Sequence, residues 1–361
     1  MSTLPLLVRV LRVPELMAGL ALSEWDLLLR QALAANLTAS LYCLADEQRL
    51  LAQAPPQPRR HLEWAGTLLR RHGAAVRFEV ARIGAALDAL GLDLILLKGA
   101  AYTMATLPPA RGRLFSDIDI LVPKAAIAEV ESQLMLAGWM STHHDEYDQR
   151  YYRVWMHEIP PMQHMHRGSV IDVHHAILPL TAALRPDPDK LRAASVALAG
   201  AGEKVRVLAP ADMVLHSATH LFQDGEFDKG LRDLLDLHRL LQHFGAEPQF
   251  WDGLPPRAVE LELARPLYYA LRYCTRLLGT AVPPAVVAAL QPAAPGPALL
   301  ALMDALFGRA LLPVHASCAD RWTSLAHSLL YIRGNWLRMP PLMLARHLFH
   351  KAFISPKPVK E

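Results

Sequence analysis

Ser116-Asp117-Ile118-Asp119-Ile120-Leu121-Val122 is the stretch that decides how this chain is interpreted. Side chains alternate between the faces of a strand, so Asp117 and Asp119 leave one face while Ile118 and Ile120 point into a core. Two carboxylates about 7 Å apart along a strand repel each other, and burying them is costly unless a cation neutralises them. Hard oxygen ligands suit Mg²⁺ or Mn²⁺. The stretch therefore predicts a metal-binding strand, although two solvated acids at a strand end give the same pattern.

A second apolar segment, Leu94-Ile95-Leu96-Leu97, ends in Lys98 and Gly99, where we expect a strand to give way to a helix. Backbone N–H groups at the start of a helix attract anions, and glycine lets a phosphate approach the backbone closely. Lys98 could neutralise triphosphate oxygens, and Arg113, with Arg111 as a weaker candidate, could grip phosphate with its guanidinium fork. The alternative for Lys98 is a surface lysine at a strand end.

The alternation in Val170-Ile171-Asp172-Val173-His174 places Asp172 and His174 on the polar face of a third strand. A site with two metal ions needs carboxylates on rigid backbone to bridge them, and Asp172 is the candidate third ligand and a candidate base for the acceptor. His174, beside it, could orient substrate or a metal-bound water. A satisfied surface aspartate is the alternative for Asp172.

Taken in order, these motifs resemble the nucleotidyltransferase superfamily with a DNA polymerase β type of palm. Within it they resemble a poorly characterised bacterial family whose signature is L-K-G, a following Arg, and then D-I-D-I-L-V. His157–His164 is similar to that family as well, and the resemblance covers roughly residues 86–240. The superfamily usually has Gly-Ser on the turn before the metal strand, whereas this chain has Gly99-Ala100. The resemblance implies an α+β fold: a polymerase-β-like palm, a mixed sheet with helices, flanked by N-terminal and C-terminal helical regions.

The breaks in the pattern predict an N-terminal helical region at 1–88, the palm at 89–208, a C-terminal helical region at 209–354 and a loose tail at 355–361. A long helix from about residue 59 to 90 leads into the palm, and a helix at 124–137 follows the metal strand. The predicted strands are 94–97, 118–122, 151–157, 162–166 and 170–174.

Composition describes an ordinary globular protein rather than a disordered or fibrous one, since 52% of 361 residues are hydrophobic and 20% charged. The net charge of +3 is small, so binding nucleic acid would require a local basic patch. Arginines on the predicted long helix hint at such a patch, although a solvated face is the more usual explanation. They are Arg59, Arg60, Arg70, Arg71, Arg77 and Arg82.

The three cysteines are far apart and lack C-x-x-C spacing, which argues against a zinc ribbon and a secreted disulfide scaffold and favours a reducing cytoplasm. Apolar runs are interrupted by charges or prolines, so we expect no membrane span. His216 and His220 do not form an H-E-x-x-H zinc motif. Together with three residues of the following helix they are expected to form a polar seam against the palm, from which one histidine could reach a base. Those three residues are Arg232, Asp233 and Asp236.

The resemblance implies a bacterial, cytoplasmic, Mg²⁺-dependent nucleotidyltransferase, with Mn²⁺ as the alternative ion. It would move a nucleoside monophosphate from an NTP, ATP first among them, to an acceptor hydroxyl or phosphate and release pyrophosphate. A small molecule, peptide or sugar of a natural-product, modified-peptide or polysaccharide pathway is the expected acceptor. The predicted catalytic and metal residues are Asp117, Asp119 and Asp172, and the predicted nucleotide contacts are Lys98, Gly99, Arg113, Ser116 and His174. The alternatives are an RNA-directed, tRNA-directed or toxin-like nucleotidyltransferase and a non-catalytic nucleotide-binding module.

Overall fold

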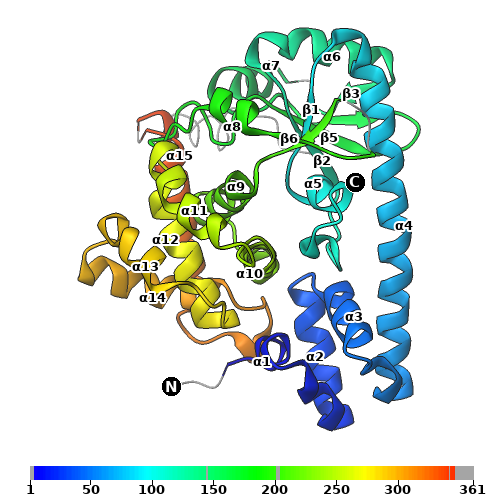
Figure 1. The fold of residues 1–361 in the computed structure, drawn as a ribbon, viewed down its shortest axis with the longest axis vertical. Coiled ribbons are helices and arrows are strands. Elements are labelled where there is room, and N and C mark those ends of the chain that lie inside the picture. Colours follow the sequence, from blue (N-terminus) through cyan, green and yellow to red (C-terminus); the bar gives the residue numbers. More distant parts are fainter. Residues whose placement is uncertain (1–3, 144, 201–203, 341, 346–361) are drawn as a thin grey trace.

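The computed structural model describes residues 4–143, 145–200, 204–340 and 342–345, and the tail predicted at 355–361 lies outside them. A seven-stranded mixed sheet with the order β3-β4-β5-β2-β1-β7-β6 lies at one end of the molecule, with helices around and below it (Figure 1). The α+β fold expected from the sequence is confirmed. The strands are β1 (Leu94–Leu96), β2 (Asp117–Leu121), β3 (Trp139–Ser141), β4 (Met162–His164), β5 (Val170–His174), β6 (Val196–Ala197) and β7 (Val205–Val207).

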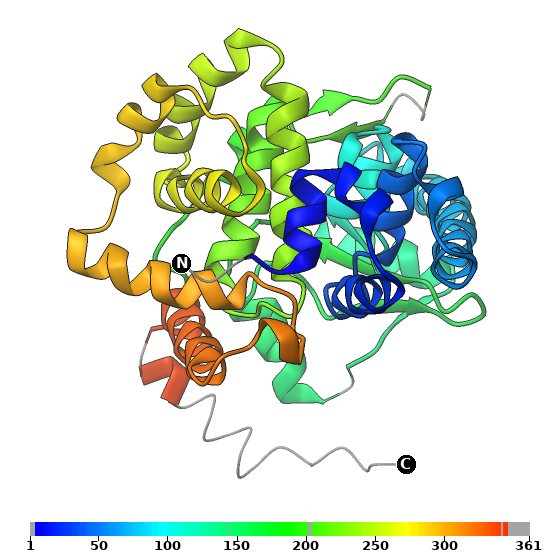
Figure 2. The ribbon, with the colours of Figure 1, turned by 90° about the horizontal axis from the view of Figure 1, so that it is seen from below.

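The N-terminal helices lie beside the long helix α4, and the C-terminal helices form the opposite side of the molecule (Figures 1 and 2). Up to the sheet the helices are α1 (Leu6–Arg12), α2 (Leu22–Ala34), α3 (Thr38–Glu47), α4 (Pro56–Leu87) and α5 (Lys98–Met104). Within the sheet region they are α6 (Ile127–Leu136), α7 (Glu146–Arg150) and α8 (Pro188–Ala194). The C-terminal ones are α9 (Pro210–Gln223), α10 (Gly230–Phe244), α11 (Pro248–Glu260), α12 (Ala264–Tyr273), α13 (Pro284–Ala289), α14 (Pro297–Ala310) and α15 (Thr323–Arg338).

The strand that carries Asp117 and Asp119, β2, lies in the middle of the sheet. β2 pairs antiparallel with β1 and parallel with β5. In the parallel pair Asp119 lies opposite Asp172, and residues that are paired in neighbouring strands point to the same side of the sheet. Ile118 and Ile120 are buried, as the alternation predicts. The pairing of β2 with β5 therefore brings two distant acidic motifs to one face.

The long helix predicted at about 59–90 is α4, which begins slightly earlier, at Pro56. Proline is favoured in the first turn of a helix because its missing N–H would be unpaired there anyway. Its buried positions, among them Leu62, Val76, Val80 and Ile83, recur at helical spacing and face the rest of the protein. With 32 residues, α4 extends past both the N-terminal helices and the sheet.

The prediction of a strand at 151–157 is wrong. The segment continues α7 as a π-helical turn from Tyr151 to Trp155. The helix starts because the side chain of Asp145 accepts a hydrogen bond from the N–H of Asp148, which caps its N-terminus. Tyr151 and Trp155 then lie four residues apart with ring centroids 6.0 Å from each other, a spacing at which aromatic pairs support a helix. Local capping outweighed the strand propensity of the aromatic residues.

The other strands and the helix at 124–137 are present, although β4 ends at His164 rather than at residue 166. Three short strands, β3, β6 and β7, were not predicted. All seven strands lie within the palm predicted at 89–208, and the domain division itself stays a prediction. Among the described residues, no helix combines the length and the apolar character needed to cross a bilayer.

Candidate active site

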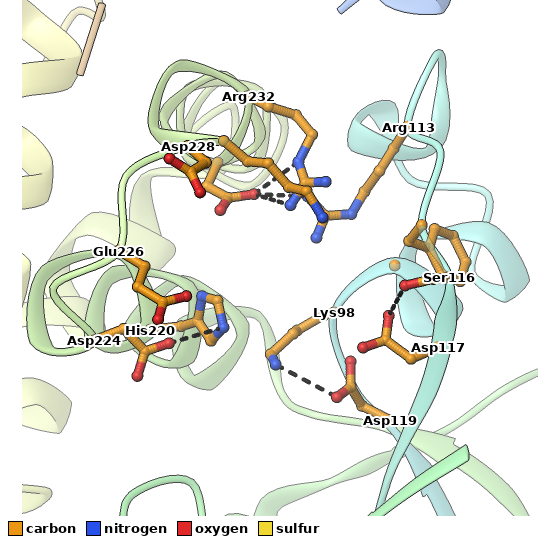
Figure 3. A pocket seen from close by; sticks show the side chains of 14 residues that line it. Lys98, Arg113, Ser116, Asp117, Asp119, His220, Asp224, Glu226, Asp228 and Arg232 are labelled. Carbon is orange, nitrogen blue, oxygen red and sulfur yellow. Dashed lines mark hydrogen bonds and ion pairs between the residues drawn. The ribbon is translucent and has the colours of Figure 1, made fainter. Parts of the chain in front are cut away.

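A cleft of about 370 Å³ opens between the sheet and the α9–α10 helices (Figure 3). Asp117 and Asp119 point into it from β2, and Lys98 reaches it from the start of α5. His220, Asp224 and Glu226 face them from the other side. The full lining is Lys98, Gly99, Arg113, Phe115, Ser116, Asp117, Asp119, His220, Asp224, Glu226, Asp228, Lys229, Arg232 and Asp233.

Asp117, Asp119 and Asp172 form a cluster in which one carboxylate oxygen from each lies within 4.8 Å of the others. Asp119 is buried, and the other two are partly buried. The spacing is short enough for one or two cations to contact all three groups. Asp172 therefore lies within reach of Asp117 and Asp119, and the roles of the three residues stay predictions.

Asp119 is held by a lysine and a histidine. Its Oδ1 lies 3.4 Å from Nζ of Lys98 and 2.9 Å from Nε2 of His174. Burial alone would raise the pKa of Asp119, but Lys98 and His174 outweigh it and hold that pKa well below its usual range. Burial would likewise lower the pKa of His174, and Glu158 and Asp119 instead raise it. Asp119 is therefore ionised at neutral pH and fixed in place.

Asp172 is in the opposite situation. Its Oδ1 is buried and has no hydrogen-bond partner among the described residues. Burial, followed by repulsion from Asp119 and Glu158, raises its pKa to about 8. Three ionised carboxylates here would outnumber the lysine that pairs with Asp119, and a divalent cation would supply the missing positive charge. The donor set, all carboxylate oxygen, fits Mg²⁺ or Mn²⁺.

His157 and Glu158 form a second group with His174 in this region, and the sequence predicted no role for either. Oε2 of Glu158 lies 3.3 Å from Nδ1 of His174, so that His174 sits between Glu158 and Asp119. Glu158 also forms an isolated β-bridge with His174, which places it beside β5. Burial raises the pKa of Glu158. The His-Glu pair was visible in the sequence, but the strand predicted over 151–157 gave no reason to place it here.

Lys98 and Gly99 form the turn between β1 and α5. The backbone of Lys98 is left-handed, with φ of +44°, which is unusual for a residue with a side chain. A Cβ atom on Gly99 would lie 2.5 Å from the ring of Phe115, so glycine is needed here for packing as well as for access to the cleft. Ala100, which stands where the superfamily usually has serine, is 1% exposed. A hydroxyl at that position would face the core and not the cleft.

Of the two predicted arginines, only Arg113 lines the cleft. Its guanidinium also pairs with Asp233 and Asp236 of α10, which makes it part of the wall rather than a free cation. Arg111 instead pairs with Glu47 of α3, 3.0 Å away, and does not line the cleft. Ser116 lines the cleft and donates a hydrogen bond of 3.3 Å from its hydroxyl to Asp117.

The predicted polar seam against the palm is present only in part. Arg232 pairs with Asp233 at 2.7 Å, and both line the cleft. His220 lines it too, with Nε2 3.2 Å from Asp224. His216 is buried, and burial followed by Lys98 lowers its pKa well below the usual value. The acidic residues between α9 and α10, Asp224, Glu226 and Asp228, were missed because nothing in their sequence marks them as facing β2.

The mixed sheet thus carries three clustered carboxylates beside the turn that holds Lys98. Residues 22–279 match the family described as "Uncharacterised nucleotidyltransferase", and the chain belongs to that family. No curated protein matches it. One solved structure that it resembles is MenT4, a nucleotidyltransferase toxin from Mycobacterium tuberculosis H37Rv. The identity is 16%, the match covers 74% of this chain and 98% of that one, and the TM-score is 0.31, so we draw no conclusion from it.

Proposed function

We propose that this protein transfers a nucleoside monophosphate from an NTP to an acceptor hydroxyl or phosphate. An acceptor oxygen attacks the α-phosphorus, the bond from that phosphorus to the α–β bridging oxygen breaks, and pyrophosphate leaves. ATP is the first NTP to test. The observation that supports this most is the carboxylate cluster of Asp117, Asp119 and Asp172, with a buried oxygen left without a partner.

The residues of the cleft would have different roles in this reaction. Asp117, Asp119 and Asp172 would hold Mg²⁺ or Mn²⁺, which when bound supplies positive charge to the triphosphate and lowers the pKa of the attacking hydroxyl. Lys98 would contact a triphosphate oxygen and Gly99 would leave room for it, with Ser116 hydrogen-bonding beside them. Arg113, which already pairs with Asp233 and Asp236, would contact a phosphate oxygen from the cleft wall. Asp172 would accept the proton that the acceptor hydroxyl loses.

His174 would act on Asp119 rather than on substrate. It lies between Asp119 and Glu158, so its ring fixes the orientation of the Asp119 carboxylate. The sequence had placed His174 among the nucleotide contacts. Its burial and its two carboxylate neighbours favour a positioning role instead.

Incubating the protein with each NTP and Mg²⁺ in the presence of candidate acceptors tests the proposal. Pyrophosphate release should accompany a mass increase of one nucleoside monophosphate on the acceptor, and both should disappear in chelator. Tight NTP binding by calorimetry without pyrophosphate release for any acceptor would instead support a nucleotide-binding module.

A further inference from the structure

The outer face of α4 carries side chains that the proposed reaction does not use. Arg60, Arg71 and Arg82 are exposed there, and two large aromatic residues lie between them. Trp64 is 61% exposed and Phe78 is 51% exposed. Single exposed aromatic residues are ordinary on a protein surface, and Trp336 is as exposed as Trp64. It is the position of these two between arginines that sets them apart.

These five residues form a single line along the helix. At about 100° per residue, positions 60, 64, 71, 78 and 82 fall within roughly 40° of one another, on the side opposite the buried residues. Arginine and aromatic residues alternate along this line, which we call the α4 stripe. It spans about 33 Å from Arg60 to Arg82.

The α4 stripe carries three arginines, and α4 as a whole is strongly basic for this protein. With six arginines against Glu63 and Glu79, α4 carries a net charge of +4, whereas the whole chain carries +3. Glu79 faces inward and pairs with Arg167 at 2.6 Å. In the described part of the chain none of the six arginines of α4 forms an ion pair, so their charge is available to a partner. They are Arg59, Arg60, Arg70, Arg71, Arg77 and Arg82. Arg82 does lie over the Phe78 ring, 5.5 Å from its centroid, and Arg167 lies 5.8 Å from the same ring.

A hollow beside α4, lined by residues next to the stripe, reaches the candidate active site. The hollow, of about 240 Å³, lies between α4 and the sheet, lined by His72 and Ala75 of α4 and by Ser116 and Asp117. Asp117 lines both this hollow and the main cleft. In Figure 1 α4 stands at the edge of the molecule alongside the sheet, with its outer face open to solvent.

We propose that the α4 stripe binds single-stranded RNA and leads its end past Asp117 into the cleft, where a terminal ribose hydroxyl is the acceptor. The choice of acceptor rests on the proposed function, whereas RNA binding by the stripe does not. The sequence alone favoured a small molecule, peptide or sugar. The alternating arginine and aromatic side chains are the reason for the change.

Single-stranded RNA fits the α4 stripe better than the other polyanions. Its unpaired bases can stack on Trp64 and Phe78 while arginines contact the phosphates, whereas a duplex keeps its bases stacked inside. An anionic membrane would also attract arginines, but two aromatic side chains spread along one helix offer little apolar surface for insertion. The ribose hydroxyls of RNA also provide the acceptor group that the proposed chemistry requires.

The test measures binding by fluorescence anisotropy with a short labelled RNA of mixed sequence, in chelator and without NTP. Two stripe variants are compared with the wild type: Trp64→Ala with Phe78→Ala, and the triple variant Arg60→Gln, Arg71→Gln, Arg82→Gln. The matched control is Arg321→Gln with Trp322→Ala, because Arg321 stacks on Trp322 at 5.2 Å and both are exposed just before α15, outside α4. Circular dichroism confirms that each variant is folded.

We expect the aromatic variant to bind RNA about 10-fold or more weakly. The arginine variant should lower the steepness of the salt dependence by about 2, as expected for three lost phosphate contacts on a single strand. The control variant should match the wild type. The α4 stripe is not an RNA surface if both stripe variants bind RNA as the wild type does, or if the control variant loses binding equally. Preferential binding of duplex RNA or of anionic vesicles would also contradict it.

A second readout separates this inference from the proposed function. The mass of the RNA after incubation with NTPs and Mg²⁺ should increase by whole nucleotides with the wild type, and at least 10-fold more slowly with the aromatic variant. RNA that binds through the stripe but gains no mass would overturn RNA as the acceptor while leaving the binding surface standing. If the protein adds nucleotide to another acceptor and does not bind RNA, RNA binding by the stripe is rejected and the proposed nucleotidyl transfer is retained.

Discussion

Asp172 of the sheet and Asp304 of α14 are both partly sheltered aspartates, yet their surroundings are opposite. Asp304 accepts hydrogen bonds from Arg272 at 2.8 and 2.5 Å and from the Tyr273 hydroxyl at 3.0 Å, and Arg276 lies 2.5 Å away. The bonds from Arg272 are the largest cause that lowers its pKa to about 2. Asp172 has an oxygen without a partner, and burial and acidic neighbours raise its pKa to about 8.

The ionised carboxylate of Asp304 stabilises the fold, whereas that of Asp172 destabilises it. Asp304 ties α12 to α14 with its charge fully matched, as expected of a structural group. Asp172 repels Asp119 and Glu158, which destabilises the protein in the absence of a cation. An arrangement that costs folding free energy is expected where charge is needed for function. The predictions below test this contrast.

The largest effect is expected from Asp119→Asn, which removes a proposed cation ligand from the centre of the cluster. Loss of a ligand that stabilises developing charge should lower kcat/KM by roughly a thousandfold or more, because several kcal/mol of stabilisation are lost. Pyrophosphate release measures it. The control, Asp304→Asn, should retain wild-type turnover, and comparable losses in the two variants would show that the contrast is not functional.

A smaller effect on activity is expected from Lys98→Ala. The proposed charge-assisted contact with a triphosphate oxygen is worth about 1.5–3 kcal/mol, so the KM for NTP should rise roughly 10-fold to 100-fold. The KM for the acceptor should stay within a few-fold of its wild-type value. An unchanged KM for NTP would show that the turn at the start of α5 does not contact the triphosphate.

The contributions of Asp172 and Asp304 to the free energy of unfolding in chelator should change with pH in opposite directions. Asp172 has a folded pKa raised from 3.8 to about 8, so the folded state binds more protons than the unfolded state between these values. Metal-free stability should therefore fall as pH rises from about 4 to 8, and Asp172→Asn should flatten that decline. Asp304 has a depressed pKa, so its contribution is present above about 4 and is lost as pH falls towards 2. Chemical denaturation at several pH values distinguishes the two, and a decline equally steep in Asp172→Asn would contradict the assignment.

The smallest effect is expected from Asp304→Asn on stability at neutral pH. Removing one charge from a partly exposed network should lower the free energy of unfolding by about 1 kcal/mol, since solvent screens such pairs. Differential scanning calorimetry would show a decrease in Tm of a few degrees. A larger loss would mean that the pairing of α12 with α14 carries more of the fold than its exposure suggests.

The sequence predicted the parts of the site that depend on alternation within a strand. The acidic residues of β2 and β5 could be placed on one face because a period of two leaves no other arrangement for Asp172 and His174. The wall opposite them could not be predicted. Asp224 and Glu226 reach the cleft only because α9 and α10 pack against the sheet, and Glu158 only because a capped helix replaces the strand expected before it. Long-range packing and helix capping leave no periodic trace in the residues that they bring together.

The most direct test of the central claim is thermal unfolding of the wild type and Asp172→Asn, in chelator and with saturating Mg²⁺. If the cluster holds a cation, Mg²⁺ should raise the Tm of the wild type, since a ligand at 100 times its Kd adds about 2.7 kcal/mol. Asp172→Asn should be at least as stable as the wild type in chelator, because repulsion is relieved, and should gain little from Mg²⁺. A wild-type Tm unaffected by Mg²⁺ and Mn²⁺, together with a metal-free Asp172→Asn less stable than the wild type, would show that Asp172 is a structural residue and that the cluster is no metal site.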